Sequence, residues 1–164
     1  RFAGMTRMGP ILPVAGGNTK IQPVYVDDVA QAAVLGITGA AQGGVYELGG
    51  PETDSLSGLV QRMLNVVHRR RLVLNLPMWI ARIMAFGFDM LQAVTFGLIP
   101  NAMITRDQLK SLSEDNVVAE GAKGFGDLGI QPVAMASILP DYLWRFRPSG
   151  QYDAIKESAK NLRT

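Results

Sequence analysis

Residues 21–40, with the sequence IQPVYVDDVAQAAVLGITGA, decide the fold class. The β-rich run 21–26 predicts a short strand. Asp27 and Asp28 follow directly, and both are good N-cap residues for a helix that begins at Val29. Apolar residues then recur at helical spacing. A strand that leads through a cap into a helix predicts an α/β chain.

The remainder of the sequence is predicted to be mostly helical. Residues 45–48 are predicted to form a second short strand closed by a Gly-Gly-Pro turn, and the alternating leucines of 72–76 favour a third. An amphipathic stripe predicts a helix capped by Asp54 or Ser55 and ending near His68. Further helices are predicted at about 76–96, 105–112 and 135–146.

Composition excludes several classes of function. The chain has 164 residues and 48% hydrophobic content, which indicate one folded domain. Its net charge of +2, with no long basic stripe, does not favour nucleic-acid binding. It has no cysteine and one histidine, so disulfides, cysteine–zinc sites, iron–sulfur clusters and histidine-rich metal sites are excluded. We therefore expect no metal site.

The N-terminus and the apolar segments give no targeting or membrane-spanning signal. The sequence begins RFAGMTRMGP without an initiator methionine or an apolar signal region. The charge-free window from Met90 to Thr105 contains Gly97 and Pro100 and is too short to span a bilayer. We expect no single transmembrane helix, and the abrupt start suggests a fragment, a truncated chain or a processed chain.

Residues 124–129, GFGDLG, match the G-x-G-x-x-G pattern of dinucleotide-binding loops. A working loop follows a strand and opens a helix, whose N-terminal amides bind the pyrophosphate. Here no strand pattern precedes the loop, and Pro132 falls where the helix should run. We interpret GFGDLG as a structural loop.

Other motifs also have simpler structural interpretations. Tyr152 and Lys156 share the Y-x-x-x-K spacing of short-chain dehydrogenases, but they lie in a polar tail. The Asp27–Asp28 pair is better explained by capping than by carboxylate catalysis. The basic run 68–71 could bind phosphate or lipid, but a solvated helix end is the simpler interpretation. For Trp79, Phe86 and Phe96, core packing and a partner surface are about equally plausible.

Two segments resemble the extended short-chain dehydrogenases/reductases, the NAD-dependent epimerase/dehydratase group. QPVYVDDVAQA at 22–32 is similar to a late Rossmann strand and helix, and GVYELGG at 44–50 to the next strand. Tyr25 stands where many members have His, and Glu47 where many have Asn. Both departures argue against a sugar-nucleotide substrate.

Later segments resemble one atypical branch, the NAD(P)H-binding accessory subunits of respiratory complex I. The resemblance includes Leu76-Pro77, TRDQL from Thr105, EDNVV from Glu114 and FGDLGIQP at 125–132. It covers roughly residues 1–148 and corresponds to the C-terminal half of such a protein. It implies that the phosphate loop, the acidic ribose-binding residue and the catalytic Tyr/Lys position would lie before Arg1.

The resemblance also implies an architecture and a cofactor site. Residues 1–50 would be the last strands and helix of a Rossmann domain, 51–148 a mostly helical small lobe, and 149–164 a polar tail. NAD or NADP would bind the full-length protein, whereas this chain alone is expected to bind neither and to be non-catalytic. The residues implied to border the nicotinamide are Gln22, Pro23 and Val24, and those on the substrate side are Phe2, Met5 and Met8.

The resemblance implies other complex I subunits as partners. The location would be the matrix side of the mitochondrial inner membrane or the cytoplasmic face of a bacterial one. The apolar helix 76–96 could contact a partner or the membrane surface. Two alternatives are part of a sugar-nucleotide epimerase/dehydratase, and a lipid- or protein-binding module. Strands 21–26 and 45–48 would lack neighbours, so the isolated chain is expected to self-associate.

Overall fold

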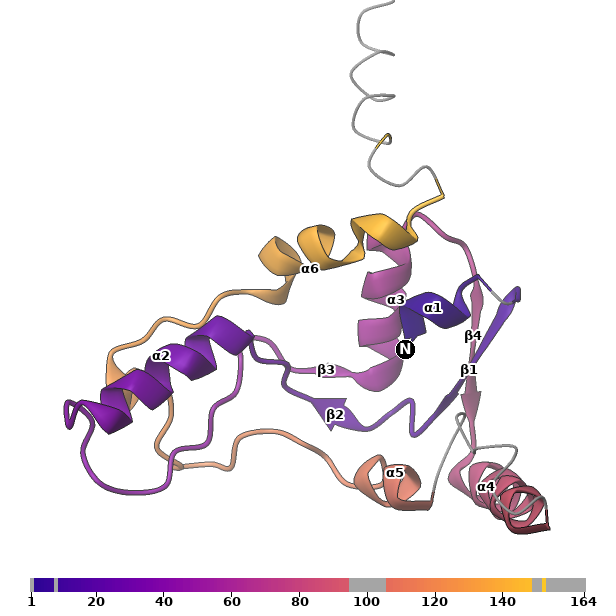
Figure 1. Cartoon of the computed structure of the whole chain (residues 1–164), viewed down its shortest axis with the longest axis horizontal. Helices are drawn as coiled ribbons and strands as arrows, with labels where there is room; N and C mark the ends of the chain where they lie inside the picture. Colours follow the sequence, from indigo (N-terminus) through magenta and orange to yellow (C-terminus); the bar gives the residue numbers. More distant parts are fainter. Residues whose placement is uncertain (1, 8, 95–105, 149–151, 153–164) are drawn as a thin grey trace, which may run out of the picture.

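The computed structural model describes residues 2–7, 9–94, 106–148 and 152 (Figure 1). In chain order its elements are α1 (Phe2–Met5), β1 (Ile11–Ala15), β2 (Lys20–Ile21), α2 (Val26–Ile37), β3 (Asp54–Ser55), α3 (Leu56–Val66), β4 (Leu72–Leu76), α4 (Met78–Val94), α5 (Arg106–Ser111), the 3-10 turn η1 (Gly126–Leu128), α6 (Met135–Leu143) and the 3-10 turn η2 (Trp144–Phe146).

The fold is α/β, as the sequence predicts. β1 and β4 pair in parallel, from Ile11 opposite Leu72 to Ala15 opposite Leu76. β2 and β3 form a second, antiparallel pair of two residues each. In Figure 1, α3 lies beside the β1–β4 pair, α6 lies across one end of α3, and α2 lies at the far side from β4.

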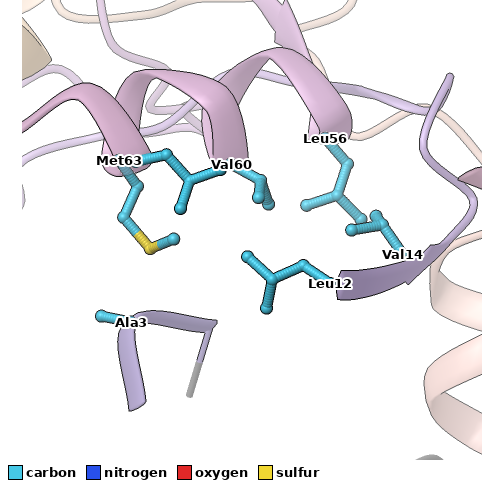
Figure 2. Packing of buried hydrophobic residues seen from close by; sticks show 7 residues of the cluster. Ala3, Leu12, Val14, Leu56, Val60 and Met63 are labelled. Carbon is cyan, nitrogen blue, oxygen red and sulfur yellow. The ribbon is translucent and has the colours of Figure 1, made fainter. Parts of the chain in front are cut away.

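The main core lies between α3, β1 and α1 (Figure 2). Leu12 and Val14 alternate along β1, so both point from the same face of the strand toward α3, and both are fully buried. The core side chains are Ala3, Leu12, Val14, Leu56, Val60, Met63 and Leu64. The amphipathic stripe predicted for α3 therefore does face a core.

The start of α3 resolves the choice between two predicted caps. Ser55 is the N-cap, and its hydroxyl accepts a hydrogen bond from the backbone N–H of Gly58 at 3.0 Å. Asp54 instead forms an ion pair with Arg62, with 2.8 Å between Oδ2 and Nε. Arg62 also pairs with Glu52. The two carboxylates thus hold the segment before α3 against Arg62, a residue of the helix itself.

The predicted strand–cap–helix pattern needs correction at residue level. α2 begins at Val26, three residues earlier than predicted, with Tyr25 at the N-cap position. Asp27 and Asp28 lie inside the first turn, where negative charge still favours the helix dipole. The strand predicted over 21–26 is therefore wrong beyond Ile21, because residues 22–25 have no regular secondary structure and α2 begins at Val26.

The second strand predicted, at 45–48, is also absent from the described structure. That segment has no regular secondary structure, and one backbone hydrogen bond, from Glu47 N–H to Lys123 O at 2.8 Å, ties it to a distant loop. A strand needs a continuous ladder of such bonds with a neighbour. The strand predicted at 72–76 is confirmed as β4.

The later helices agree with prediction in the described ranges. α4 begins just after Pro77, and α6 continues through Pro140. Predicted positions at 95–105 and most of the 149–164 tail lie outside the described residues. A second small core of Ala15, Ala81, Ala85 and Leu109 joins β1, α4 and α5. The division proposed at residue 50 remains a prediction, and the β1–β4 pairing crosses it.

Candidate functional site

Gln22, the first residue implied to border a nicotinamide, lies where three segments meet. Its side-chain Nε2 donates to Gly50 O at 2.7 Å, and its Oε1 accepts from Val118 N–H at 3.0 Å. Its backbone N–H donates to Asn116 O at 3.0 Å. Because both ends of the amide are engaged, Gln22 holds this junction together.

The Gly49–Gly50 pair allows the junction to close. A Cβ on Gly50 would lie 1.9 Å from the carbonyl oxygen of Pro23, and one on Gly49 would lie 2.5 Å from Cδ of Gln22. At Gly50 the clash would be with backbone, so this glycine is required for the close approach of the two chain segments. At Gly49 a side chain would displace the side chain of Gln22.

Glu47 extends the same junction toward residues 118–124. Its Oε2 accepts from Ala119 N–H at 2.7 Å. Lys123 Nζ lies 5.7 Å from the centre of the Tyr46 ring, within cation–π range. Glu47 thus has a structural partner on the neighbouring loop.

The other predicted site residues are placed as follows. Pro23 is half-buried, and Val24 is exposed beside the junction. Phe2 and Met5 are half-buried on α1 and pack against the main core. Met8 lies outside the described residues. Gln22 and Pro23 both belong to the junction. The helix α1 lies instead beside α3, at a different place in the molecule (Figure 1). Their roles toward cofactor and substrate remain predictions.

Asp28 is a buried carboxylate whose role the sequence interpretation missed. It is 2% exposed, and its Oδ2 accepts from Val133 N–H at 2.8 Å. It therefore ties the first turn of α2 to the segment before α6. The Asp-Asp sequence shows two acids but does not show which of them is buried.

Tyr25, directly before α2, interacts with the first of these acids. A hydrogen bond from its phenol to Asp27, together with desolvation and the nearby negative charges, raises the pKa of Tyr25 to about 12. Tyr25 is therefore a neutral hydrogen-bond donor at physiological pH. It is not an activated proton-transfer group.

The GFGDLG segment folds as a closed turn. Gly124 N–H donates to Asp127 Oδ2 at 2.8 Å, and Ile130 N–H donates to Phe125 O at 3.0 Å. Gly129 adopts the left-handed conformation with φ of 67°. The next helix, α6, begins only at Met135, so the turn does not open a helix as a phosphate-binding loop does.

The basic run after α3 has structural partners. Arg69 Nε donates to Phe146 O and Arg71 Nε donates to Thr6 O, each at 3.0 Å. Arg147 Nε in turn donates to Val66 O at 3.0 Å, near the end of α3. Two arginines of the run therefore bind carbonyl groups of other segments, which the sequence interpretation as a solvated helix end did not foresee.

α4 carries an apolar surface that is more than half exposed. Ala81 and Ala85 are buried, whereas Phe86 is 51% exposed and Val94 is 70% exposed. We call the exposed residues, which are spaced three or four apart on one side of the helix, the outer stripe: Trp79, Ile83, Phe86, Met90 and Val94. In the described part of the chain, no helix is both long and apolar enough to cross a bilayer.

A hollow of about 500 Å³ lies between α4 and α5. We call it the α4–α5 groove, and its lining residues are Arg82, Phe86, Leu109, Lys110 and Ser113. Arg82 and Lys110 thus line the same hollow as Phe86 of the outer stripe. Among the described residues, no group of three or more potential metal ligands is found.

Comparison with known proteins places these features in a family. The chain is 34% identical over 140 residues, 84% of its length, to subunit 9 of the mitochondrial NADH dehydrogenase [ubiquinone] 1 alpha subcomplex of Arabidopsis thaliana. The chain is a partial homologue of these NADH:ubiquinone oxidoreductase subunits. It is also 28% identical over 159 residues to the mitochondrial NADH-ubiquinone oxidoreductase 40 kDa subunit of Neurospora crassa.

The homology is partial in length. The chain spans 35% of the Arabidopsis subunit and 39% of the Neurospora subunit. The solved structure of gox2253 matches the fold with a TM-score of 0.52 at 22% identity, covering 87% of this chain and 43% of that one. No family model matches the chain. The resemblance to complex I subunits is thus confirmed, and the structural match supports the fold alone.

Proposed function

We propose that the chain is the C-terminal portion of a non-catalytic, NAD(P)H-binding accessory subunit of respiratory complex I, with a structural or assembly role. The observation that carries this proposal is the 34% identity to the Arabidopsis subunit across most of the chain. The named relatives are mitochondrial, which favours the matrix side of the inner membrane. Complex I subunits would then be the partners.

NAD or NADP would be held mainly by parts of such a subunit that this chain does not contain. In this chain, GFGDLG is closed by its own hydrogen bonds. Gln22 uses its amide to fasten Gly50 and Val118, so it would shape the nicotinamide end of a cleft. Pro23 and Val24 would supply the surface that borders the ring.

The chain alone is therefore expected not to bind NADPH tightly. Titration of the 164-residue chain into NADPH, followed by nucleotide fluorescence, measures this directly. Micromolar affinity would show that some loop of the chain is a phosphate site after all.

The outer stripe of α4 is the surface we propose for docking. The five side chains of the outer stripe are each 51–70% exposed, and leaving apolar surface in water is unfavourable. Burying the exposed part of each against a partner would contribute about 1–2 kcal/mol. Contact with a neighbouring subunit or with the membrane surface would provide that burial.

The test of the proposed function is assembly. The protein, carrying an affinity tag in its source cells, should migrate with NADH:ubiquinone oxidoreductase activity on native gels of gently solubilised membranes. Deleting its gene should reduce the amount of assembled complex. A tagged protein found only as a separate soluble species, with normal complex I in the deletion strain, would refute the proposal.

Self-association of the isolated chain also remains a prediction. Among the described residues, β1 and β4 each pair with one neighbour only, so each leaves one strand edge unpaired. Light scattering at high concentration would detect dimers or larger species. A stable monomer would contradict the prediction.

A further inference from the structure

We propose that the α4–α5 groove binds the phosphate headgroup of an anionic phospholipid, so that the outer stripe lies on a membrane surface. This inference rests on the docking role proposed above. It specifies what the docking surface contacts and which residues recognise it.

The first observation is the charge of the groove. Arg82 from α4 and Lys110 from α5 line the same hollow, and none of the described residues that line it is a carboxylate. Among the described residues, neither cation takes part in an ion pair. Asp89 on α4 and Asp107 on α5 lie on the same helices but do not line the groove. Two basic side chains converging from different elements suit a phosphate group.

The second observation is that the groove adjoins an apolar surface. Phe86 lines the groove and also belongs to the outer stripe. A free anion would need only the cations, whereas a phospholipid needs cations for its headgroup and apolar area for its acyl chains. The side-by-side arrangement of both favours the lipid. Amphipathic helices that lie in the membrane interface combine the same two features.

The third observation is the position of α4. The helix lies at one edge of the molecule, next to α5 and the end of β4, while α2 and α6 lie elsewhere (Figure 1). α4 is thus at the periphery of the described elements (Figure 1). Trp79, near the N-terminal end of α4, is exposed and suits the boundary between headgroups and acyl chains.

Vesicle binding of the 164-residue chain tests the inference. The chain contains two tryptophans, so Trp144→Phe leaves Trp79 as the only one. This variant should co-sediment with phosphatidylcholine vesicles that contain phosphatidylglycerol, and its fluorescence should shift to the blue. Vesicles of phosphatidylcholine alone should bind much more weakly, and added salt should weaken binding to the anionic vesicles.

Substitutions then assign the binding to the groove. Arg82→Gln with Lys110→Gln should weaken binding to anionic vesicles at least about tenfold. The matched control, Arg70→Gln with Arg145→Gln, removes the same charge from exposed positions outside the groove and should have a much smaller effect. Phe86→Ser should keep the charge attraction but reduce the Trp79 shift. Thermal unfolding of each variant checks that it folds.

Several results would overturn the inference. Equal losses of vesicle affinity in the groove double variant and the control double variant would indicate nonspecific charge attraction. Equal binding to neutral and anionic vesicles would exclude headgroup recognition. If millimolar inorganic phosphate releases the chain from anionic vesicles, and if Trp79 fluorescence does not shift on those vesicles, the groove is a site for free anions. If the chain does not bind vesicles while the tagged protein still migrates with complex I, the lipid inference fails and the proposed function stands.

Discussion

The buried carboxylate of Asp28 accepts a 2.8 Å hydrogen bond from the backbone N–H of Val133, a residue 105 positions further along the chain. Through this contact the first turn of α2 fixes the segment that leads into α6. The same residue pair therefore connects the part of the chain that resembles a Rossmann domain with the part that resembles a small lobe.

Asp28→Ala should destabilise the protein by about 1–3 kcal/mol, because it removes the acceptor of the Val133 N–H and leaves a space where the buried carboxylate lay. Asp28→Asn keeps an acceptor oxygen and should cost less. Asp141→Ala, at an exposed position on α6, is the control. Urea unfolding compares the stability of the three variants. Equal stability for Asp28→Ala and Asp141→Ala would show that the Asp28–Val133 hydrogen bond contributes nothing.

Gln22→Leu should destabilise the loop junction by about 1–3 kcal/mol, since Gly50 O and Val118 N–H both lose their partner. Amide hydrogen exchange at Val118 should accelerate strongly. Gln131→Leu removes an exposed glutamine and serves as the matched control. Unchanged protection of Val118 in the Gln22 variant would contradict the proposed role of the side-chain amide.

Alanine at two glycines should act in opposite directions. At Gly50 the added Cβ would lie 1.9 Å from Pro23 O, so Gly50→Ala should force the junction apart and lower the melting temperature sharply. At Gly36, in α2, nothing lies within 4 Å, and alanine should stabilise the helix by about 1 kcal/mol. Calorimetry of both variants tests the pair. A tolerated alanine at Gly50 would show that the loops are not in close contact.

Tyr25 should titrate late in the folded protein. Its pKa of about 12, against the ordinary 10, means that folding favours the neutral phenol. The resulting stabilisation is complete below pH 10 and is lost as the pH rises from 10 to 12. Phenolate absorbance of the protein, minus that of Tyr25→Phe, isolates this group. Asp27→Asn should bring the pKa back toward 10, and a Tyr25 that already titrates near 10 would refute the interaction.

The elements that the sequence predicted correctly are those with a strong local pattern. α3 and β4 follow from leucine and valine spacing alone. β1 was missed because Pro13 interrupts its apolar run, yet a two-stranded sheet tolerates a proline. The strand predicted at 45–48 is wrong for a different reason: its composition is β-rich, but among the described residues its backbone makes a single such hydrogen bond, to Lys123 O.

Long-range contacts limited what could be predicted about the site. The later segments, among them TRDQL at 105–109 and FGDLGIQP at 125–132, indicated the complex I subunits, but no motif indicated the contact of Gln22 with Val118, 96 residues away. The burial of Asp28 depends equally on a distant partner. The apolar character of α4 was evident in the sequence, whereas the exposure of Phe86 required the positions of α5 and β4.

The most direct test of the account is co-purification of a Phe86→Asp variant with complex I. Phe86 is 51% exposed, so the new charge should stay in water and leave the melting temperature nearly unchanged. If the outer stripe docks the subunit, the variant should separate from the complex, whereas Ile37→Asp, at an 85% exposed site on α2, should remain bound. A Phe86→Asp variant that melts and co-purifies normally would contradict the claim that this face docks.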